Sequence, residues 1–134
     1  MRFNLSVDHS FADLYIHLCE YMKSIAANSV DRMLRAFSDP TRLRILNLLL
    51  PGELCVCDHV SMLRIPQPTV SRHSAYLRQS DLVEARRDGL WMYYKLAAPR
   101  TTFHKKLIDC LECCFQDVPQ LAKEVRQLNE KRCC

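Results

Sequence analysis

The feature that most constrains the fold is a single change of hydrophobic period late in the chain. Residues 82–86 and 90–96 are rich in strand-forming side chains, and they flank Arg87-Asp88-Gly89. The Asp-Gly dipeptide in this stretch supplies the positive backbone angles of a tight hairpin. The segments before and after the hairpin have apolar residues at helical spacing instead. The pattern therefore predicts a mainly α chain that contains one β-hairpin.

The helices before the hairpin are separated by recognisable helix breakers. Apolar residues at helical spacing predict one helix over residues 10–26 and a second over residues 30–37. Asp39-Pro40 then interrupts the pattern and restarts it, because aspartate caps a helix and proline fits the first helical position. Pro51-Gly52 ends this next helix.

The remaining elements follow in an order that is typical of one fold. A short helix after residue 55 is followed by a turn at Pro66 and a polar-faced helix over residues 68–79. Beyond the hairpin, the pattern predicts a long helix over residues 103–118 and a further turn or two beyond Pro119. Two helices, a short helix, a polar helix, a hairpin and a helix form, in this order, a winged helix-turn-helix.

Positive charge is concentrated on the polar helix and the hairpin. The 134 residues carry a net charge of +4, and residues 61–100 alone hold seven basic against three acidic side chains. In a winged helix-turn-helix the polar helix enters the major groove of DNA, and the hairpin, or wing, contacts the backbone or the minor groove. Neutralisation of DNA phosphates therefore explains where the charge lies, and a merely solvated basic face is the alternative.

Eight cysteines in a chain without an export signal predict reduced thiols that bind metal or take part in redox chemistry. The N-terminus carries Asp8 and Asp13 beside apolar residues and lacks the layout of a signal peptide. No apolar run approaches the ~20 residues of a membrane span. We therefore expect a cytoplasmic protein with no membrane association.

Cys55 and Cys57 stand one residue apart at the start of the predicted short helix. Amide hydrogens at a helix start favour the thiolate, which is the form of cysteine that binds metals. Two soft sulfurs at this spacing reach one soft ion, such as trivalent arsenic or antimony, cadmium, lead or zinc. The alternative is that both are small buried hydrophobic side chains.

Three stretches resemble the ArsR/SmtB family of bacterial metal-responsive repressors, over about residues 28–100. They read FSDPTRLRIL at 37–46, ELCVCD at 53–58, and QPTVSRH at 67–73 with YLR at 76–78. The second stretch is similar to the arsenic- and antimony-responsive branch, whose members are dimeric repressors that leave their operators when a trivalent metalloid binds cysteine thiolates. The resemblance implies a homodimer on double-stranded operator DNA, with As(III) or Sb(III) as inducer.

Two positions depart from the pattern of that branch. Val60 stands where the branch often has a third cysteine, so the third nearby thiol is missing. Ser74 occupies a position where leucine is usual, which leaves a polar group near the inner face of the polar helix.

A trivalent arsenic ion prefers three thiolates, and the sequence leaves the third one open. Cys19, on the N-terminal helix, is one candidate, from the same or the partner subunit, as N-terminal thiols are in some relatives. A second candidate group is spaced i, i+3 and i+4 along one face of the last long helix: Cys110, Cys113 and Cys114. Packing in the core or at a dimer interface is the alternative for the first and last of these three.

The histidines and the terminal cysteines are less informative. His59 follows Asp58 and is interpreted as a surface or supporting residue rather than a zinc ligand. Zinc-sensing relatives place an aspartate and two or more histidines on the last long helix, where His104 stands alone, so that form of zinc site is not expected. Cys133 and Cys134 end the chain and either add affinity or have no role.

The polar helix and the wing contain the side chains expected to contact DNA. Five residues at the start of the polar helix are expected to reach base edges: Gln67, Thr69, Ser71, Arg72 and His73. Tyr76 and Arg78 are expected at phosphates, with helix packing as the alternative for Tyr76. In the wing, Arg86 and Arg87 are expected at phosphate or a narrow minor groove, and Gly89 provides the turn.

The sequence predicts three parts. Residues 1–27 form an N-terminal helical extension, residues 28–100 the winged helix-turn-helix domain, and residues 101–134 a C-terminal helix with a cysteine-bearing tail. The apolar stripe of the last long helix is expected to form a two-fold dimer interface together with the N-terminal helix.

Three alternatives to a metalloid sensor remain at this point. The same fold can respond to cadmium, lead or zinc, or to thiol oxidation and persulfidation. A small arsenate reductase would need an oxyanion-binding loop, but Gly52 and Gly89 are the only glycines, so we expect no enzyme. A thiol-based metal-trafficking protein would have no use for the basic hairpin.

Overall fold

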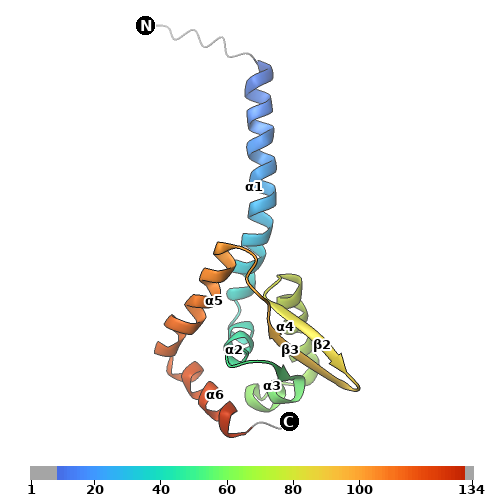
Figure 1. Cartoon of the computed structure of the whole chain (residues 1–134), viewed down its shortest axis with the longest axis vertical. Coiled ribbons are helices and arrows are strands. Elements are labelled where there is room, and N and C mark those ends of the chain that lie inside the picture. Colours follow the sequence, from blue (N-terminus) through green and yellow to red (C-terminus); the bar gives the residue numbers. More distant parts are fainter. Residues whose placement is uncertain (1–8, 132–134) are drawn as a thin grey trace. The chain divides into compact units, whose positions relative to one another are not determined.

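A computed structural model describes residues 9–131, with side chains described outside 9–11 and 22–28. The chain divides into two compact units, residues 1–31 and residues 32–134. The elements, in order, are α1 (His9–Phe37), α2 (Pro40–Leu48), β1 (Leu54–Cys55), α3 (Val56–Leu63), α4 (Gln67–Gln79), β2 (Val83–Asp88), β3 (Trp91–Leu96), α5 (Thr102–Cys114), a 3-10 turn η1 (Phe115–Asp117) and α6 (Pro119–Glu130) (Figure 1). Within residues 9–131, no helix combines the length and the apolar character that crossing a bilayer requires.

The N-terminal segment is one helix, where the sequence predicted two. α1 continues through residues 26–30 without interruption. The prediction was wrong because it took a change in the apolar stripe for a boundary. The chain has no proline or glycine in this segment, and without a breaker the helical backbone continues.

The start of α2 confirms the predicted capping signal. Asp39 has an extended backbone, and its carboxylate accepts a hydrogen bond of 2.9 Å from the amide of Arg42. Pro40 occupies the first helical position, where no amide hydrogen is needed. A cap of this kind stabilises a helix by about 1 kcal/mol, and here it fixes where the central helix begins.

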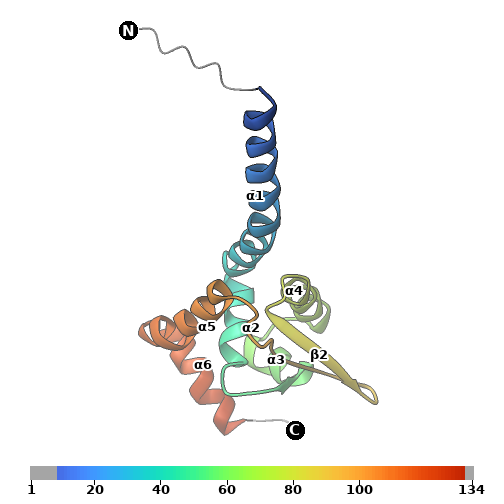
Figure 2. The same cartoon turned by 45° about the horizontal axis from the view of Figure 1, so that its top comes forward.

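The hydrophobic core of residues 32–134 is built around α2. Ile45, Leu46 and Leu48 are fully buried, and apolar side chains from every later helix pack in the same cluster. Figures 1 and 2 show α2 between α5 and α6 on one side and α4 with the hairpin on the other. The predicted inward residues of α4, Val70 and Leu77, are both fully buried.

The sheet has three antiparallel strands in the order β1-β3-β2, where the sequence predicted two. The added strand, β1, is only two residues long, and its Cys55 pairs with Tyr93 of β3. A two-residue strand has no detectable alternation, so periodicity could not predict it. As a result, one cysteine of the Cys55/Cys57 pair belongs to the same sheet as the wing.

The turn of the wing lies one residue later than predicted. β2 continues to Asp88, which pairs with Trp91, so Gly89-Leu90 form the turn rather than Asp88-Gly89. Gly89 has φ +59°, and glycine at the first central position suits a tight hairpin turn. Arg86 and Arg87 therefore lie within β2, beside the turn rather than in it.

The joint between α3 and α4 is short, as in other helix-turn-helix units. Arg64 ends α3 in the left-handed conformation, with φ 56° and ψ 40°, and its amide donates a 3.0 Å hydrogen bond to the carbonyl of Val60. The turn predicted at Pro66 follows at once, since α4 begins at Gln67. Only two residues, Ile65 and Pro66, separate Arg64 from α4.

The C-terminal region contains two helices rather than one long helix with a short continuation. α5 ends at Cys114, before the predicted end, and α6 is a full helix of 12 residues. Pro119 begins this helix, because proline fits a first helical position although it cannot continue a preceding helix. α6 is fixed to α2 by Asn47, whose amide donates a 2.9 Å hydrogen bond to the carbonyl of Leu121.

Candidate thiol site and nucleic-acid interface

The junction of β1 and α3 brings the two predicted thiols together. Cys55 is the last residue of β1 and the N-cap of α3, and its sulfur accepts a 3.5 Å hydrogen bond from the amide of Cys57. The Sγ–H of Cys57 also points to the sulfur of Cys55, at 2.9 Å. Cys55 is 1% exposed and Cys57 is half-buried, so an ion would reach the pair from the side of Cys57.

The donor atoms of this site suit a soft ion. Two thiols, which are soft ligands, select thiophilic ions over hard oxygen-seeking cations. A tetrahedral ion with metal–sulfur bonds of about 2.3 Å holds two sulfurs about 3.8 Å apart, so the pair is close enough to share one ion after a small outward movement. Among residues 9–131, no three histidine, cysteine or acidic side chains are already gathered as a metal site.

His59 supports the thiol site from within the core. Its ring is fully buried, lies edge-on to Tyr94, and its Nδ1 is 3.1 Å from the carbonyl oxygen of Cys55. Burial lowers the pKa of His59, against smaller opposing effects of the Cys55 carbonyl and Asp58. The neutral ring therefore donates from Nδ1 to Cys55. The sequence analysis placed His59 at the surface or in a supporting role, and only the supporting role fits.

The other cysteines occupy two different elements. Cys19 lies on α1, in the first compact unit, and is partly exposed. All three cysteines of α5 are exposed: Cys110, Cys113 and Cys114. A hydrogen bond with Cys110 raises the pKa of Cys114, so these two thiols are in contact on one face of α5. Exposure excludes packing in the core of the same chain for all three. Cys133 and Cys134 lie outside the described residues.

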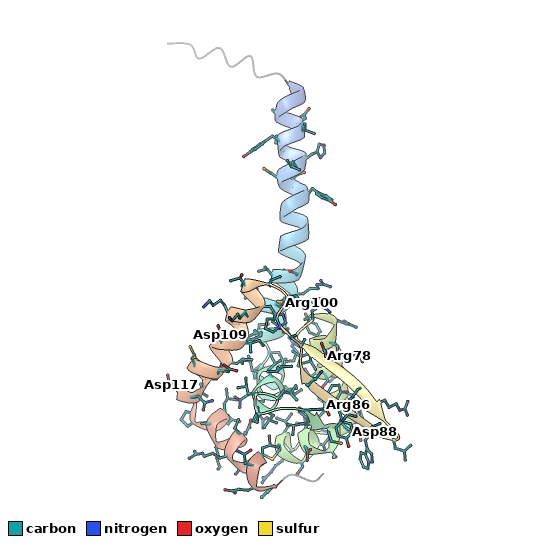
Figure 3. The ribbon with its side chains drawn as sticks, viewed as in Figure 1. Arg78, Arg86, Asp88, Arg100, Asp109 and Asp117 are labelled. Carbon is teal, nitrogen blue, oxygen red and sulfur yellow. The ribbon has the colours of Figure 1, made fainter. Side chains whose placement is uncertain are left out.

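The predicted DNA-reading residues line the accessible side of α4. Gln67, Arg72 and Arg78 are exposed, whereas Thr69 and Ser71 are partly exposed. Ser74 is fully buried, which confirms a polar group on the inner face of α4. Arg78 appears in Figure 3 on the same side of the molecule as the hairpin residues Arg86 and Asp88.

Two of the predicted DNA-binding side chains are held by the start of α2. The Nδ1 of His73 lies 3.7 Å from a carboxylate oxygen of Asp39. The guanidinium of Arg42 stacks on the ring of Tyr76, with 4.2 Å between its central carbon and the ring centroid. Asp39 and Arg42, at the start of α2, thus help to fix the orientation of α4. Sequence analysis gave Asp39 only a capping role and missed Arg42, because contacts between helices leave no local pattern.

The two arginines of the wing have partners in the chain itself. Arg86 forms a bidentate hydrogen-bonded pair with Glu53, and its central carbon lies 4.4 Å from the ring centroid of Tyr93. Arg87 donates a 3.2 Å hydrogen bond from Nε to the carbonyl of Gly89. Sequence analysis missed Glu53, which is 33 positions from Arg86 and becomes its neighbour only through β1.

Fold and site together define the class of this protein: α3, the tight joint and α4 form a helix-turn-helix, and β2 and β3 form the wing behind it. The sequence profile of the arsR family of bacterial regulatory proteins matches residues 39–85. The arsenical resistance operon repressor of Escherichia coli K12 is 39% identical over 103 residues, which cover 76% of this chain and 86% of the relative. The chain belongs to the ArsR family.

Solved structures of two proteins agree with this assignment. The transcriptional repressor BigR from Xylella fastidiosa superposes with a TM-score of 0.59 at 29% identity, over 75% of this chain and 96% of BigR. The homodimeric winged helix-turn-helix DNA-binding domain of Mb0332 from Mycobacterium bovis, a possible ArsR-family regulator, gives a TM-score of 0.58 at 30% identity, over 67% of this chain and 81% of that one.

Proposed function

We propose that the protein is a metalloid-responsive transcriptional repressor, which binds operator DNA as a dimer and releases it when As(III) or Sb(III) binds cysteine thiolates. The observation that carries the proposal is the pair of adjoining thiols at the start of α3, the helix that directly precedes and packs against α4. Similarity to the arsenical resistance operon repressor of E. coli supports this choice of ion over cadmium, lead or zinc.

The coupling between ion and DNA follows from the tight connection of the two helices. Ligation draws Cys57 and Cys55 into a new separation at one end of α3, and the short joint after Arg64 transmits a movement of α3 to α4. The ion shifts the equilibrium only by its difference in affinity for the two arrangements. A coupling of about 1–3 kcal/mol lowers operator affinity roughly 5- to 150-fold.

DNA recognition is assigned to the residues predicted for it. The start of α4 reads base edges through Gln67, Thr69, Ser71, Arg72 and His73, while Tyr76 and Arg78 lie toward phosphates. The wing contributes Arg86, Arg87 and the turn at Gly89. In the proposed dimer, residues 1–27 and 101–134 form the interface and space two α4 helices about 34 Å apart, one turn of DNA. The homodimeric Mycobacterium bovis domain supports such an assembly.

The third thiolate is assigned to Cys19. It is partly exposed on α1, and a helix that takes part in dimer formation can bring it to the Cys55 and Cys57 pair of either subunit. The three cysteines of α5 form the competing candidate group, because two of them already share a hydrogen bond. The two assignments can be told apart by the number of sulfur ligands on the bound ion. Cys19→Ser lowers this number if Cys19 is the third ligand, and Cys113→Ser lowers it if the cysteines of α5 supply the ligand.

Gel shifts test the proposal with a duplex selected from a random-sequence pool. Saturating arsenite is expected to lower the affinity of the reduced protein for this duplex at least fivefold. Cys57→Ser is expected to bind DNA normally and lose most of the response, whereas Cys113→Ser, also one thiol fewer, keeps it. X-ray absorption on arsenite-loaded Cys19→Ser and Cys113→Ser then counts the sulfurs. Unchanged DNA affinity at saturating arsenite refutes metalloid sensing.

Thiol oxidation is the one alternative that a specific distance favours. The sulfurs of Cys55 and Cys57 lie 2.9 Å apart, so a disulfide or polysulfide bridge between them needs little movement. Release of the selected duplex by peroxide or polysulfide, with no effect of arsenite, would replace the metalloid by an oxidant as the signal.

A further inference from the structure

Glu53 has no part in the proposed function, yet it holds one of the wing arginines. It precedes β1 directly, and both of its carboxylate oxygens lie 3.0 Å from the Nε of Arg86. The Nη2 of the same guanidinium lies 2.5 Å from Oε1. This is the bidentate fork that arginine forms with carboxylates and with phosphates alike.

Two further groups contact the exposed side chain of Arg86. Its guanidinium stacks on Tyr93, and its Nη1 lies 3.6 Å from a carboxylate oxygen of Asp88. Figure 3 shows Arg86 and Asp88 together on the hairpin. Tyr93 is the cross-strand partner of Arg86 and also of Cys55. The arginine is thus bound on the sheet that also holds the buried thiol.

The charges of the pair support each other. The hydrogen bond from Arg86 lowers the pKa of Glu53, and the same hydrogen bond raises the pKa of Arg86. Both groups are therefore charged at neutral pH. A guanidinium already paired in this way is a poorer partner for DNA, because it must give up the carboxylate before it can neutralise a phosphate.

We propose that Glu53 is an internal competitor of DNA phosphate for Arg86, and that it sets the affinity of the wing for DNA. This inference rests on one part of the proposed function, the contact of the wing with DNA, and it does not require the response to a metalloid. Glu53 is one residue from β1, so the segment that carries Cys55 also fixes where the competitor stands. It is a positioning residue, which acts on DNA through Arg86.

The chain contains a matched control for this competitor. Glu84 pairs with Lys95 across β2 and β3 at 3.3 Å, and both pairs line the same small hollow on the sheet. Glu84→Gln removes the same charge as Glu53→Gln from the same surface, but it leaves Arg86 paired. Both variants change the net charge by the same amount and both release one cation, Lys95 in Glu84→Gln and Arg86 in Glu53→Gln, so a larger gain in Glu53→Gln reports what is particular to Arg86.

The test measures affinity for the selected duplex, and its salt dependence, by fluorescence anisotropy on the reduced full-length protein. Glu53→Gln is expected to bind about three- to tenfold more tightly than Glu84→Gln, because in each wing of a dimer the Arg86 guanidinium no longer has Glu53 as a competing partner. The slope of log affinity against log salt is expected to steepen more in Glu53→Gln than in Glu84→Gln, by an amount that corresponds to about one to two additional phosphate contacts. In an Arg86→Ala background the two glutamine variants are expected to behave alike.

Equal affinity and equal salt slope for Glu53→Gln and Glu84→Gln would overturn the inference, while arsenite-sensitive DNA binding of the unaltered protein would leave the proposed function standing. A difference between the two variants that persists without Arg86 would also overturn it, because the competitor would then act on another group. Failure of the unaltered protein to bind any duplex would refute the proposed function and the inference together.

Discussion

At the scale of single residues, the described part of the protein contains buried polar atoms that lack a hydrogen-bond partner, and three of them belong to Ser74 and His104. The Oγ of Ser74 is buried beneath α4, and both ring nitrogens of His104 are buried at the start of α5. A buried polar group without a hydrogen bond costs free energy. Ser74 and His104 are therefore expected to lower the free energy of unfolding through their unpaired polar atoms, although both side chains are well packed.

Ser74, within α4, and Ser80, the C-cap residue of the same helix, provide a matched pair. The buried hydroxyl of Ser80 donates a 2.9 Å hydrogen bond to the carbonyl of Tyr76. Ser74→Ala is expected to raise the free energy of unfolding by up to about 1 kcal/mol, and Ser80→Ala to lower it by about 1 kcal/mol. Urea unfolding at one fixed protein concentration measures both. A loss in Ser74→Ala as large as that in Ser80→Ala would show that the Ser74 hydroxyl has a partner after all.

His104 makes stability depend on pH. Burial lowers its pKa below the ordinary 6.5, Arg100 lowers the pKa further, and Asp81 opposes both. The unfolded chain therefore binds a proton at a higher pH than the folded chain, and stability falls as the pH falls below about 6.5. The slope from one such group is at most about 1.4 kcal/mol per pH unit. His104→Leu is expected to reduce the loss between about pH 7.5 and 5.5 in urea unfolding, with the buried His59 responsible for part of the remainder, whereas the exposed-site variant His17→Gln keeps the full loss.

At the scale of elements, α6 is bound to α2 through polar contacts that the sequence did not indicate. Arg44 and Glu124 approach to 2.7 Å, with the carboxylate side chain only 8% exposed. Arg44→Met leaves that carboxylate buried without its cation and is expected to cost about 2–3 kcal/mol of unfolding free energy. The double variant Arg44→Met/Glu124→Leu is expected to recover most of the loss in urea unfolding. A double variant as unstable as the single one would mean that the pair contributes through packing alone.

The elements that the sequence predicted are those with strong local signals. Local residue patterns are enough to determine the cap at Asp39, the polar helix and the two long strands, whatever packs against them in the fold. The exceptions depend on distant contacts: β1 exists because Leu54 and Cys55 pair with β3, and the turn at Gly89-Leu90 follows from the register of the whole hairpin. α6 was underestimated because Pro119 looked like an end when it is a beginning.

The candidate site divides in the same way. Cys55, Cys57 and the exposed residues of α4 were predicted from spacing and family resemblance, since they are close in sequence. Glu53, Arg42 and the buried role of His59 were not predicted, because each depends on a partner that only the fold brings near. Local chemistry is readable in the sequence, and the contacts that tune it are not.

At the scale of the whole molecule, α1 exposes apolar side chains of a size that a monomer rarely leaves in water. Leu14 is 66% exposed, Tyr15 64% and Leu18 54%. Such a surface on one helix indicates an interaction surface, in agreement with the proposed dimer. Formation of a dimer links stability to concentration, since association favours the folded state.

The midpoint of urea unfolding is accordingly expected to rise with protein concentration. Leu14→Glu with Leu18→Glu places two charges one helical turn apart on this surface and is expected to shift the protein to monomer in sedimentation experiments. His17→Glu adds a charge to the same helix without removing an apolar contact and is expected to keep the dimer. A midpoint that stays constant over a hundredfold range of concentration would argue against association.

The left-handed residue at the end of α3 has a consequence for how easily the proposed sensor is released. A side-chain-bearing residue in that conformation is less stable than in an ordinary one by about 1–2 kcal/mol, which glycine would largely avoid. Arg64 therefore holds the joint between the two helices in a strained conformation, and a movement that changes this conformation releases part of that strain. In the proposed mechanism, a thiophilic ion that turns α3 relative to α4 is therefore helped by the strain that leaves Arg64 when its backbone changes conformation.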